Sequence, residues 1–162
     1  KKGDPNKYNL PKPIFDRGGC NLSFAGLKTA VLKITKEIKT DQEKFDLAAS
    51  FQKTVIEILN KKTKIAFAEY EKLIKTKKKF VVAGGVAANK KIKLKLESLC
   101  KKENYQCLFP SIELCGDNAA MIAMVGLEKY KQNKFSKLDH PANPRWALDE
   151  TAKFLKGAGV KL

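Results

Sequence analysis

Hydrophobic residues recur every three or four positions in two adjacent stretches of the chain, and this spacing predicts two amphipathic helices. The first stretch runs from Leu27 to about Thr40. The second begins after Thr40 and is predicted to be the longest helix of the chain, with a break near Asn60. Thr40 stands three positions before Glu43, which is the spacing of a capping box and predicts the start of this second helix.

Short apolar segments and helical stretches alternate in the rest of the chain. Residues 79–85 (KFVVAGG) and 105–110 (YQCLFP) are short and apolar and predict two strands. Residues 87–102 and 116–132 have helical spacing. This order predicts an α/β fold in which right-handed crossovers make the two strands parallel neighbours, with helices on the faces of the sheet. We expect the first two helices to cover one of these faces.

Proline and glycine interrupt the pattern near the ends of the chain. Residues 1–20 hold three prolines, so we expect an extended lead-in that crosses a surface. The last stretch also contains prolines, and we expect it to dock through Trp146. The chain does not begin with methionine, and we expect it to be cut from a longer protein.

The charge of the chain points to an anionic partner. The 162 residues include 33 Lys plus Arg and 17 Asp plus Glu, which gives a formal net charge of +16. Such an excess is typical of proteins that bind nucleic acid. Nearly all of the basic residues are lysines, however, and a solvated lysine surface explains the same count equally well.

Several classes of protein are excluded by the sequence. No apolar run approaches the roughly 20 residues of a membrane-spanning helix, so we expect a soluble, cytoplasmic protein without membrane contact. The four cysteines have no C-x-x-C spacing and are interpreted as reduced thiols. His140 is the only histidine, and we expect it at the surface. This excludes a two-histidine metal site and a Ser-His-Asp hydrolase within these residues.

Two loops lie where parallel α/β sheets bind ligands, between the end of a strand and the start of a helix. In the first loop, Gly84 and Gly85 let a ligand approach the backbone, and Asn89 can donate and accept hydrogen bonds to a purine or a ribose. A tight turn without a ligand also explains the paired glycines. In the second loop, Asp117 is either a metal ligand or, as composition alone favours, the N-cap of the following helix.

A third candidate is the stretch SFAGLKTAV at residues 23–31. A small residue and a glycine before a helix suggest a loop that packs against a ligand or a neighbouring domain. The residues around Lys28 and Thr29 lack the spacing of a P-loop. Burial of Phe24 and Leu27 against the sheet would explain most of this pattern.

Four motifs in this order are more specific than any one of them: NLSFAGLKTAV, VVAGGVAANKKIKLKL, CGDNAAMIA and NPRW. From about Pro11 to Trp146, the chain resembles the C-terminal half of the tRNA threonylcarbamoyladenosine transferase family (TsaD, formerly Gcp or O-sialoglycoprotein endopeptidase). The resemblance implies an actin-like, Hsp70-like two-lobed ATPase fold of the ASKHA class. Residues 1–20 would then lead in from a missing first lobe, residues 21–146 would form the second lobe, and residues 147–162 would be a C-terminal tail.

The resemblance also implies a function. Members of this family transfer a threonylcarbamoyl group from threonylcarbamoyl-AMP to the N6 amine of the adenosine beside the anticodon, in tRNAs that read codons beginning with A. The expected partners are tRNA and, in bacteria, the pathway proteins TsaB and TsaE. The isolated chain is expected to be inactive, because the contacts of the first lobe are missing.

Four positions match functional residues of the family. Gly84, Gly85 and Asn89 match residues that bind an adenine nucleotide, either ATP or threonylcarbamoyl-AMP. Asp117 matches a ligand of an iron or zinc ion that two histidines of the first lobe also hold. Such an ion would polarise the carbamoyl carbonyl as a Lewis acid.

The sequence departs from the family at two positions and leaves two other functions open. Asn21 stands where many relatives have an acidic residue, and Gly116 stands where many have threonine. One alternative is a metal-dependent glycoprotein endopeptidase, but no H-E-x-x-H motif or nucleophile elbow favours it. The other is a non-catalytic actin-like scaffold lobe, which would bind partners tightly and would not respond to substitution of Asn89 or Asp117.

Overall fold

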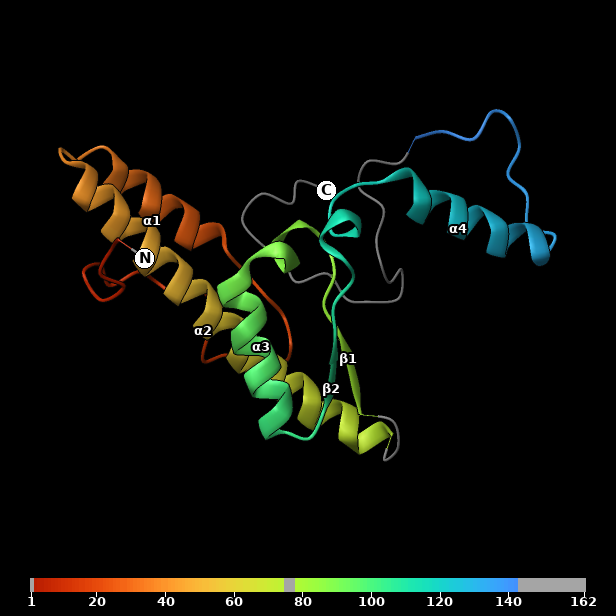
Figure 1. The fold of residues 1–162 in the computed structure, drawn as a ribbon, viewed down its shortest axis with the longest axis horizontal. Helices are drawn as coiled ribbons and strands as arrows, with labels where there is room; N and C mark the ends of the chain where they lie inside the picture. The colour runs from red at the N-terminus through yellow and green to blue at the C-terminus, as the bar shows by residue number, and fades with distance from the viewer. Residues whose placement is uncertain (1, 75–77, 143–162) are drawn as a thin grey trace. The chain divides into compact units, whose positions relative to one another are not determined.

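The elements follow the order that the sequence pattern predicts: two helices, a strand, a helix, a second strand and a last helix (Figure 1). Our computed structural model describes residues 2–74 and 78–142. The chain divides after Gly116 into a first unit, residues 1–116, and a second unit, residues 117–162. The predicted α/β class and the parallel pairing of the two strands are confirmed.

Helix α1 spans Ala25–Thr35 and ends earlier than predicted, since the pattern extended it to about Thr40. The cause lies at the start of the next helix. The Glu43 carboxylate accepts hydrogen bonds from the backbone N–H groups of Lys39 and Thr40, each at 2.9 Å. Because these N–H groups are engaged, they do not continue α1. The predicted capping box is confirmed, as the Glu43 N–H also donates to the Thr40 hydroxyl at 3.2 Å.

Helix α2 runs without interruption through Asp41–Leu73, a length of 33 residues. The predicted break near Asn60 is wrong. The helix contains no proline or glycine, and an asparagine in its interior lowers helix stability by less than about 1 kcal/mol. Burial of Ile58 on one side of Asn60 and of Phe67 on the other stabilises the continuous helix. Within the described residues, neither α2 nor any other helix is long and apolar enough to cross a membrane.

The first core cluster lies where the lead-in, α1 and α2 meet. Its buried residues are Leu10, Leu27, Leu47 and Ile58, and Phe24 packs against them. The expectation that Phe24 and Leu27 lie against the sheet is therefore wrong. The apolar face of α1 finds a closer partner in α2, because the two helices are neighbours in sequence and lie side by side (Figure 1).

The lead-in, residues 2–20, is irregular in structure and lies along α2. The backbone N–H of Asp4 donates to the Asp46 carboxylate at 2.8 Å. The backbone N–H of Tyr8 donates to the Ser50 hydroxyl at 3.2 Å. Asp46 and Ser50 are both buried, so these hydrogen bonds satisfy polar groups inside the first unit.

Strands β1 (Lys79–Val81) and β2 (Gln106–Leu108) pair in parallel, with Phe80 opposite Cys107. Helix α3 (Lys90–Lys102) connects them. Each strand has three residues, fewer than the apolar runs predict. Beyond β1 the Val82 N–H still donates to the Leu108 carbonyl at 2.9 Å, and the 3₁₀ turns Gly85–Ala88 and Ile112–Leu114 begin only a few residues after the strands.

A second core cluster joins α2, α3 and the sheet. Phe67 of α2 stacks on Tyr105 with ring centroids 3.7 Å apart and meets Phe80 of β1 edge-on at 5.2 Å. Leu99 and Cys100 of α3 complete the cluster. The prediction that the first two helices cover the sheet is therefore correct for the second half of α2, whereas α1 packs in the first cluster instead.

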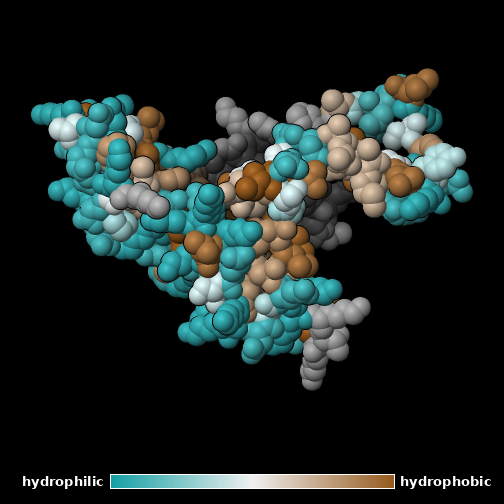
Figure 2. Space-filling view, viewed as in Figure 1, coloured by the Kyte–Doolittle hydropathy of each residue, from teal (hydrophilic) through white to brown (hydrophobic). Residues whose placement is uncertain are grey.

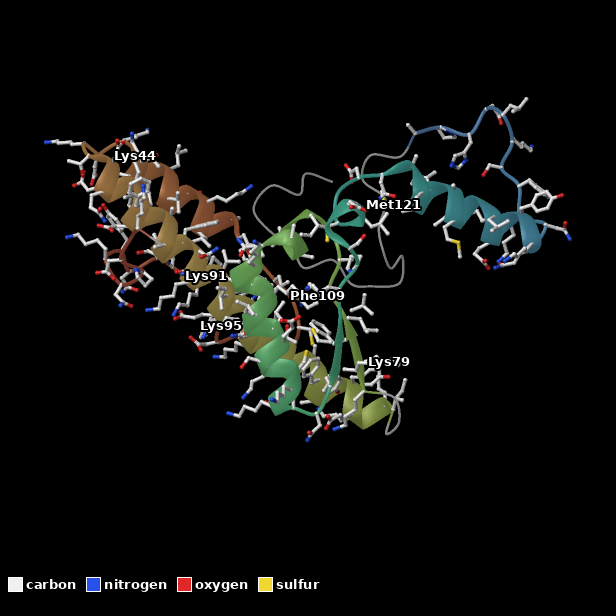
Figure 3. The ribbon with its side chains drawn as sticks, viewed as in Figure 1. Lys44, Lys79, Lys91, Lys95, Phe109 and Met121 are labelled. Carbon is white, nitrogen blue, oxygen red and sulfur yellow. The ribbon has the colours of Figure 1, made fainter. Side chains whose placement is uncertain are left out.

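In the second unit, helix α4 spans Ala119–Lys131. None of its residues is buried, and Figure 2 shows apolar side chains at the surface along it. Met121, which Figure 3 labels, is 44% exposed. His140 is exposed, as predicted. Trp146 and the predicted tail, residues 147–162, lie outside the described residues.

The four cysteines are free, and their environments differ. Cys20 is exposed and Cys100 is buried. Burial, reinforced by a hydrogen bond with the Cys107 thiol, raises the pKa of the Cys100 thiol to about 12. Because the thiolate is the nucleophile, we expect iodoacetamide at about pH 8 to alkylate Cys20 and to leave Cys100 unmodified in the folded protein.

Mass spectrometry after alkylation with and without urea measures this difference between Cys20 and Cys100. Equal modification of both thiols without urea would contradict the burial of Cys100.

The raised pKa of Cys100 also makes the stability of the fold depend on pH. The contribution of the neutral Cys100 thiol is complete below its ordinary pKa of 9.0 and is lost as the pH rises toward about 12.

Candidate functional site

The chain leaves β1 through a turn that requires one of its two glycines. Gly84 has a φ of +88°, in the region that side chains with a Cβ rarely adopt. Its carbonyl accepts a hydrogen bond from the Ala87 N–H at 2.9 Å, and this starts a 3₁₀ turn, Gly85–Ala88. Turn formation alone therefore explains Gly84.

The same explanation does not apply to Gly85. Its φ lies outside the left-handed region, and a Cβ added to it would meet no atom within 4 Å. Gly85 is also exposed. Because neither the fold nor the packing of the first unit requires a glycine here, the backbone at Gly85 is open to a ligand.

Asn89 is the N-cap of α3, a role that the sequence analysis did not predict. Its Oδ1 accepts hydrogen bonds from the backbone N–H groups of Lys91 and Ile92 at 3.0 and 3.2 Å. The Nε2 amide of Gln52 also donates to this oxygen, at 3.1 Å. The sequence analysis expected Asn89 both to donate to a ligand and to accept from it. Its Oδ1 is already engaged within the protein, so its amide N–H groups are what it can offer to a ligand.

Gly85 and Asn89 line one pocket, with a volume of about 680 Å³. A volume of this size suits a nucleotide. Most of its wall is apolar and comes from α2, α3 and the residue before α1: Phe24, Phe51, Val55, Leu59 and Ile92. Gln52 and Asn89 add two amide side chains, and none of the described residues that line the pocket is charged. Such a lining suits an uncharged, flat ring that offers hydrogen-bonding groups at its edge.

The wall formed by α2 was missed by the sequence analysis, which treated this part of the helix as core only. Phe51 is 38% exposed, and Gln52 interrupts the apolar positions of the helix. A polar amide between apolar residues on one helical face was the available signal. The contact of Gln52 with Asn89, 37 residues later, was not accessible from local pattern.

Asp117 opens the second unit and is exposed. The interpretation of Asp117 as the helix N-cap is wrong, because the neighbouring Asn118 takes that position. The Oδ1 of Asn118 accepts a hydrogen bond from the Met121 N–H at 2.9 Å. Capping therefore does not account for the carboxylate of Asp117.

The described residues contain no group of three or more His, Cys, Asp or Glu side chains that could hold a metal ion. Within residues 2–74 and 78–142, Asp117 is therefore not part of such a group. An exposed carboxylate at the start of a helix fits the chemistry of a single oxygen ligand to iron or zinc.

Comparison with known proteins gives a consistent result. Residues 1–124 match a family described as TsaD: tRNA N6-adenosine threonylcarbamoyltransferase. A protein of that name from Pelagibacter ubique is 72% identical over 163 residues, which cover 100% of this chain and 46% of the relative. Relatives with the same name from Rickettsia rickettsii and Ruegeria pomeroyi are 47% and 39% identical, over 93% and 99% of this chain. The chain spans under half the length of these relatives, 45% and 46% for the last two.

Proposed function

The chain belongs to the tRNA N6-adenosine threonylcarbamoyltransferase family, TsaD, and we propose that it forms part of an enzyme with that activity. The enzyme transfers a threonylcarbamoyl group from threonylcarbamoyl-AMP to the N6 amine of the adenosine beside the anticodon, in tRNAs that read codons beginning with A. In this proposal the chain is most of the second lobe of an actin-like, Hsp70-like fold. The parallel α/β arrangement of the first unit supports that placement.

The observation that carries the proposal is the pocket beside Gly85 and Asn89. Its apolar wall fits the faces of an adenine ring, and aromatic rings at Phe24 and Phe51 suit stacking on a base. The Asn89 amide N–H groups would donate to a ring nitrogen or to the ribose. The open backbone at Gly85 lets the nucleotide approach without a clash.

The chain's own residues would act mainly by binding and orientation. Gln52 holds the Asn89 side chain through its hydrogen bond, so the donor of Asn89 has a fixed direction. The apolar wall would exclude water from the reactive mixed anhydride. In the transfer step, the N6 amine attacks the carbamoyl carbon, a C–N bond forms, and the bond from that carbon to the phosphate oxygen breaks. AMP leaves, and the N6 nitrogen gives up one proton to water.

We further propose that Asp117 supplies one carboxylate to an iron or zinc ion. The other ligands would be histidines in the part of the relatives that this chain does not span. When bound, such an ion supplies Lewis-acid chemistry at the carbamoyl carbonyl. In the same proposal, the enzyme acts on tRNA in the cytoplasm, and in bacteria it functions together with TsaB and TsaE.

Substitution of Gly85 tests the proposed pocket in the protein at the full length of its relatives. We expect Gly85→Val to weaken binding of an adenine nucleotide roughly tenfold or more, because the side chain would overlap the ligand and not the protein. The fold should tolerate the change, since a Cβ at this position meets nothing within 4 Å. Isothermal titration with ATP, together with a transfer assay on tRNA, measures both effects.

Gly18→Val is a matched control for this experiment. Gly18 is also exposed, and a Cβ added there also meets nothing within 4 Å, but Gly18 does not line the pocket. We expect it to bind ATP like the wild type. If both variants bind ATP with wild-type affinity, the nucleotide does not lie against Gly85.

A further inference from the structure

A groove lies next to the proposed nucleotide pocket, on an adjacent face of α2. It has a volume of about 590 Å³ and is formed by α2, α3 and the start of the lead-in. Gln52 lines both the groove and the pocket, so the two are neighbours. We call it the lysine groove, and the residues that line it include Asn6, Gln52, Lys53, Ile56, Glu57, Asn60, Lys91, Leu94 and Lys95.

Lys91 and Lys95 give this groove its charge. They are exposed, stand one turn apart on α3 (Figure 3), and make no ion pair with any of the described residues. Their neighbour Lys93 differs, since its ammonium lies 3.9 Å from the Glu97 carboxylate and 5.0 Å from the centre of the Phe109 ring. Lys91 and Lys95 are thus available for an anionic ligand.

The side of the groove opposite α3 has little negative charge to balance Lys91 and Lys95. Lys53 of α2 donates to the Asn6 side chain at 2.6 Å. Among the described residues that line the groove, Glu57 is the only acidic one, and its carboxylate is shared by Lys12 and Lys53. The groove therefore has a net positive charge at its rim.

The remaining lining combines apolar surface with amide side chains. Ile56 and Leu94 offer apolar surface, and Leu94 is 64% exposed. Asn6, Gln52 and Asn60 offer amide groups. The Oδ1 atom of Asn60 is buried and has no hydrogen-bond partner among the described residues, so the fold leaves an acceptor unused beside the groove. Unsatisfied buried acceptors are uncommon in folded proteins.

This set of groups matches one nucleotide of an RNA strand. Phosphates bind lysines, base faces pack on apolar side chains, and base edges form hydrogen bonds with amides. An acidic peptide would use the lysines, but its backbone would not require three amides around an apolar floor. The volume also suits one nucleotide.

We propose that the lysine groove binds a nucleotide of the tRNA substrate that neighbours the acceptor adenosine, with Lys91 and Lys95 on its phosphates. This inference rests on the proposed function, because it takes tRNA as the substrate. It adds a location for the RNA: the strand enters beside Gln52, next to the pocket that holds the adenylate.

The test compares two double variants in the protein at the full length of its relatives. Lys91→Gln with Lys95→Gln removes two charges from the groove. Lys33→Gln with Lys36→Gln removes two charges from exposed positions of α1 and its C-cap, which do not line the groove. The probe is an unmodified transcript of a tRNA that reads codons beginning with A, and its binding is measured by filter retention at several salt concentrations.

We expect the groove variant to bind the transcript about tenfold more weakly, and its plot of log K against log salt to be shallower by roughly 1.4 to 1.8, the loss of two phosphate contacts. The α1 variant should retain the wild-type affinity and slope. If the groove variant matches the α1 variant in both quantities, the proposal is overturned. It is also overturned if the groove variant keeps its tRNA affinity but loses binding to a partner protein.

Asn60→Leu provides a second test that separates ligand binding from structure. The change removes an unpaired buried acceptor, so the urea midpoint of unfolding should not fall. The KM for tRNA should rise several-fold while kcat stays the same. A lower midpoint with an unchanged KM would assign Asn60 a structural role and contradict its place in the groove.

These outcomes distinguish failure of this inference from failure of the proposed function. If the wild-type protein with its pathway partners transfers no threonylcarbamoyl group to the transcript, the proposed function fails, and with it the premise of the groove. If the wild type transfers the group and the groove variants match it in tRNA affinity and salt dependence, the function stands and the groove proposal fails.

Discussion

Replacing Asp117 by alanine is expected to reduce threonylcarbamoyl transfer by at least about a hundredfold, because the proposed metal site would lose a ligand and with it Lewis-acid assistance worth several kcal/mol. The fold should be unaffected. Asp117 is exposed, and the hydrogen bond that caps α4 comes from Asn118 instead. The measurement is threonylcarbamoyl transfer to tRNA by the protein at the full length of its relatives, with its pathway partners present. Metal content by mass spectrometry of the purified variant gives a readout that does not depend on activity.

Asn118→Ala is the matched control, because it changes the adjacent residue and removes the cap. We expect it to lower the stability of α4 by about 1 kcal/mol and to leave the metal content unchanged. If Asp117→Ala retains both full transfer and full metal content, Asp117 is not a metal ligand. The chemistry would then depend on residues other than Asp117.

Ile58→Ala is expected to lower the free energy of unfolding of the first unit by about 2 to 5 kcal/mol. Ile58 is 0% exposed and lies in the middle of α2, where it packs with Leu10, Leu27 and Leu47. Removing its side chain leaves a cavity between three segments of the chain that cannot all move inward. Urea denaturation followed by circular dichroism measures the loss.

Leu32→Ala on α1 is the control for this experiment, since Leu32 is 61% exposed. Its loss should change the free energy of unfolding by less than about 0.5 kcal/mol. Equal effects of the two substitutions would mean that the first core cluster does not stabilise the unit.

The order of elements and the parallel strand pair were predictable because helical and strand patterns are local properties of the sequence. The ends of the helices were not. Helix α1 stops where Glu43 binds the N–H groups of the preceding turn, and this depends on a side chain that belongs to the next helix. The continuity of α2 through Asn60 depends on packing at both ends of the helix, which outweighs the weak local preference.

The candidate site shows the same division. Gly85 and Asn89 follow a strand, so position in the sequence indicated them, and the structure places both on one pocket. Gln52 and Phe51 come from a helix almost 40 residues earlier, and only the tertiary fold brings them there. At the start of α4, Asp117 and Asn118 are both good capping residues, and the choice between them is set by backbone geometry that composition does not reveal.

The capping box between α1 and α2 makes the reversal of the chain dependent on an ionised carboxylate. Hydrogen bonds from the backbone N–H groups of Lys39 and Thr40, and then from the Thr40 hydroxyl, hold the pKa of Glu43 below its ordinary value of 4.5. The stability that Glu43 contributes is therefore fully present above that value and is lost as the pH falls through the lower pKa of the folded state. Acid would loosen the corner at which α1 and α2 meet while the apolar contacts of Leu27 and Ile58 persist, since those contacts carry no charge.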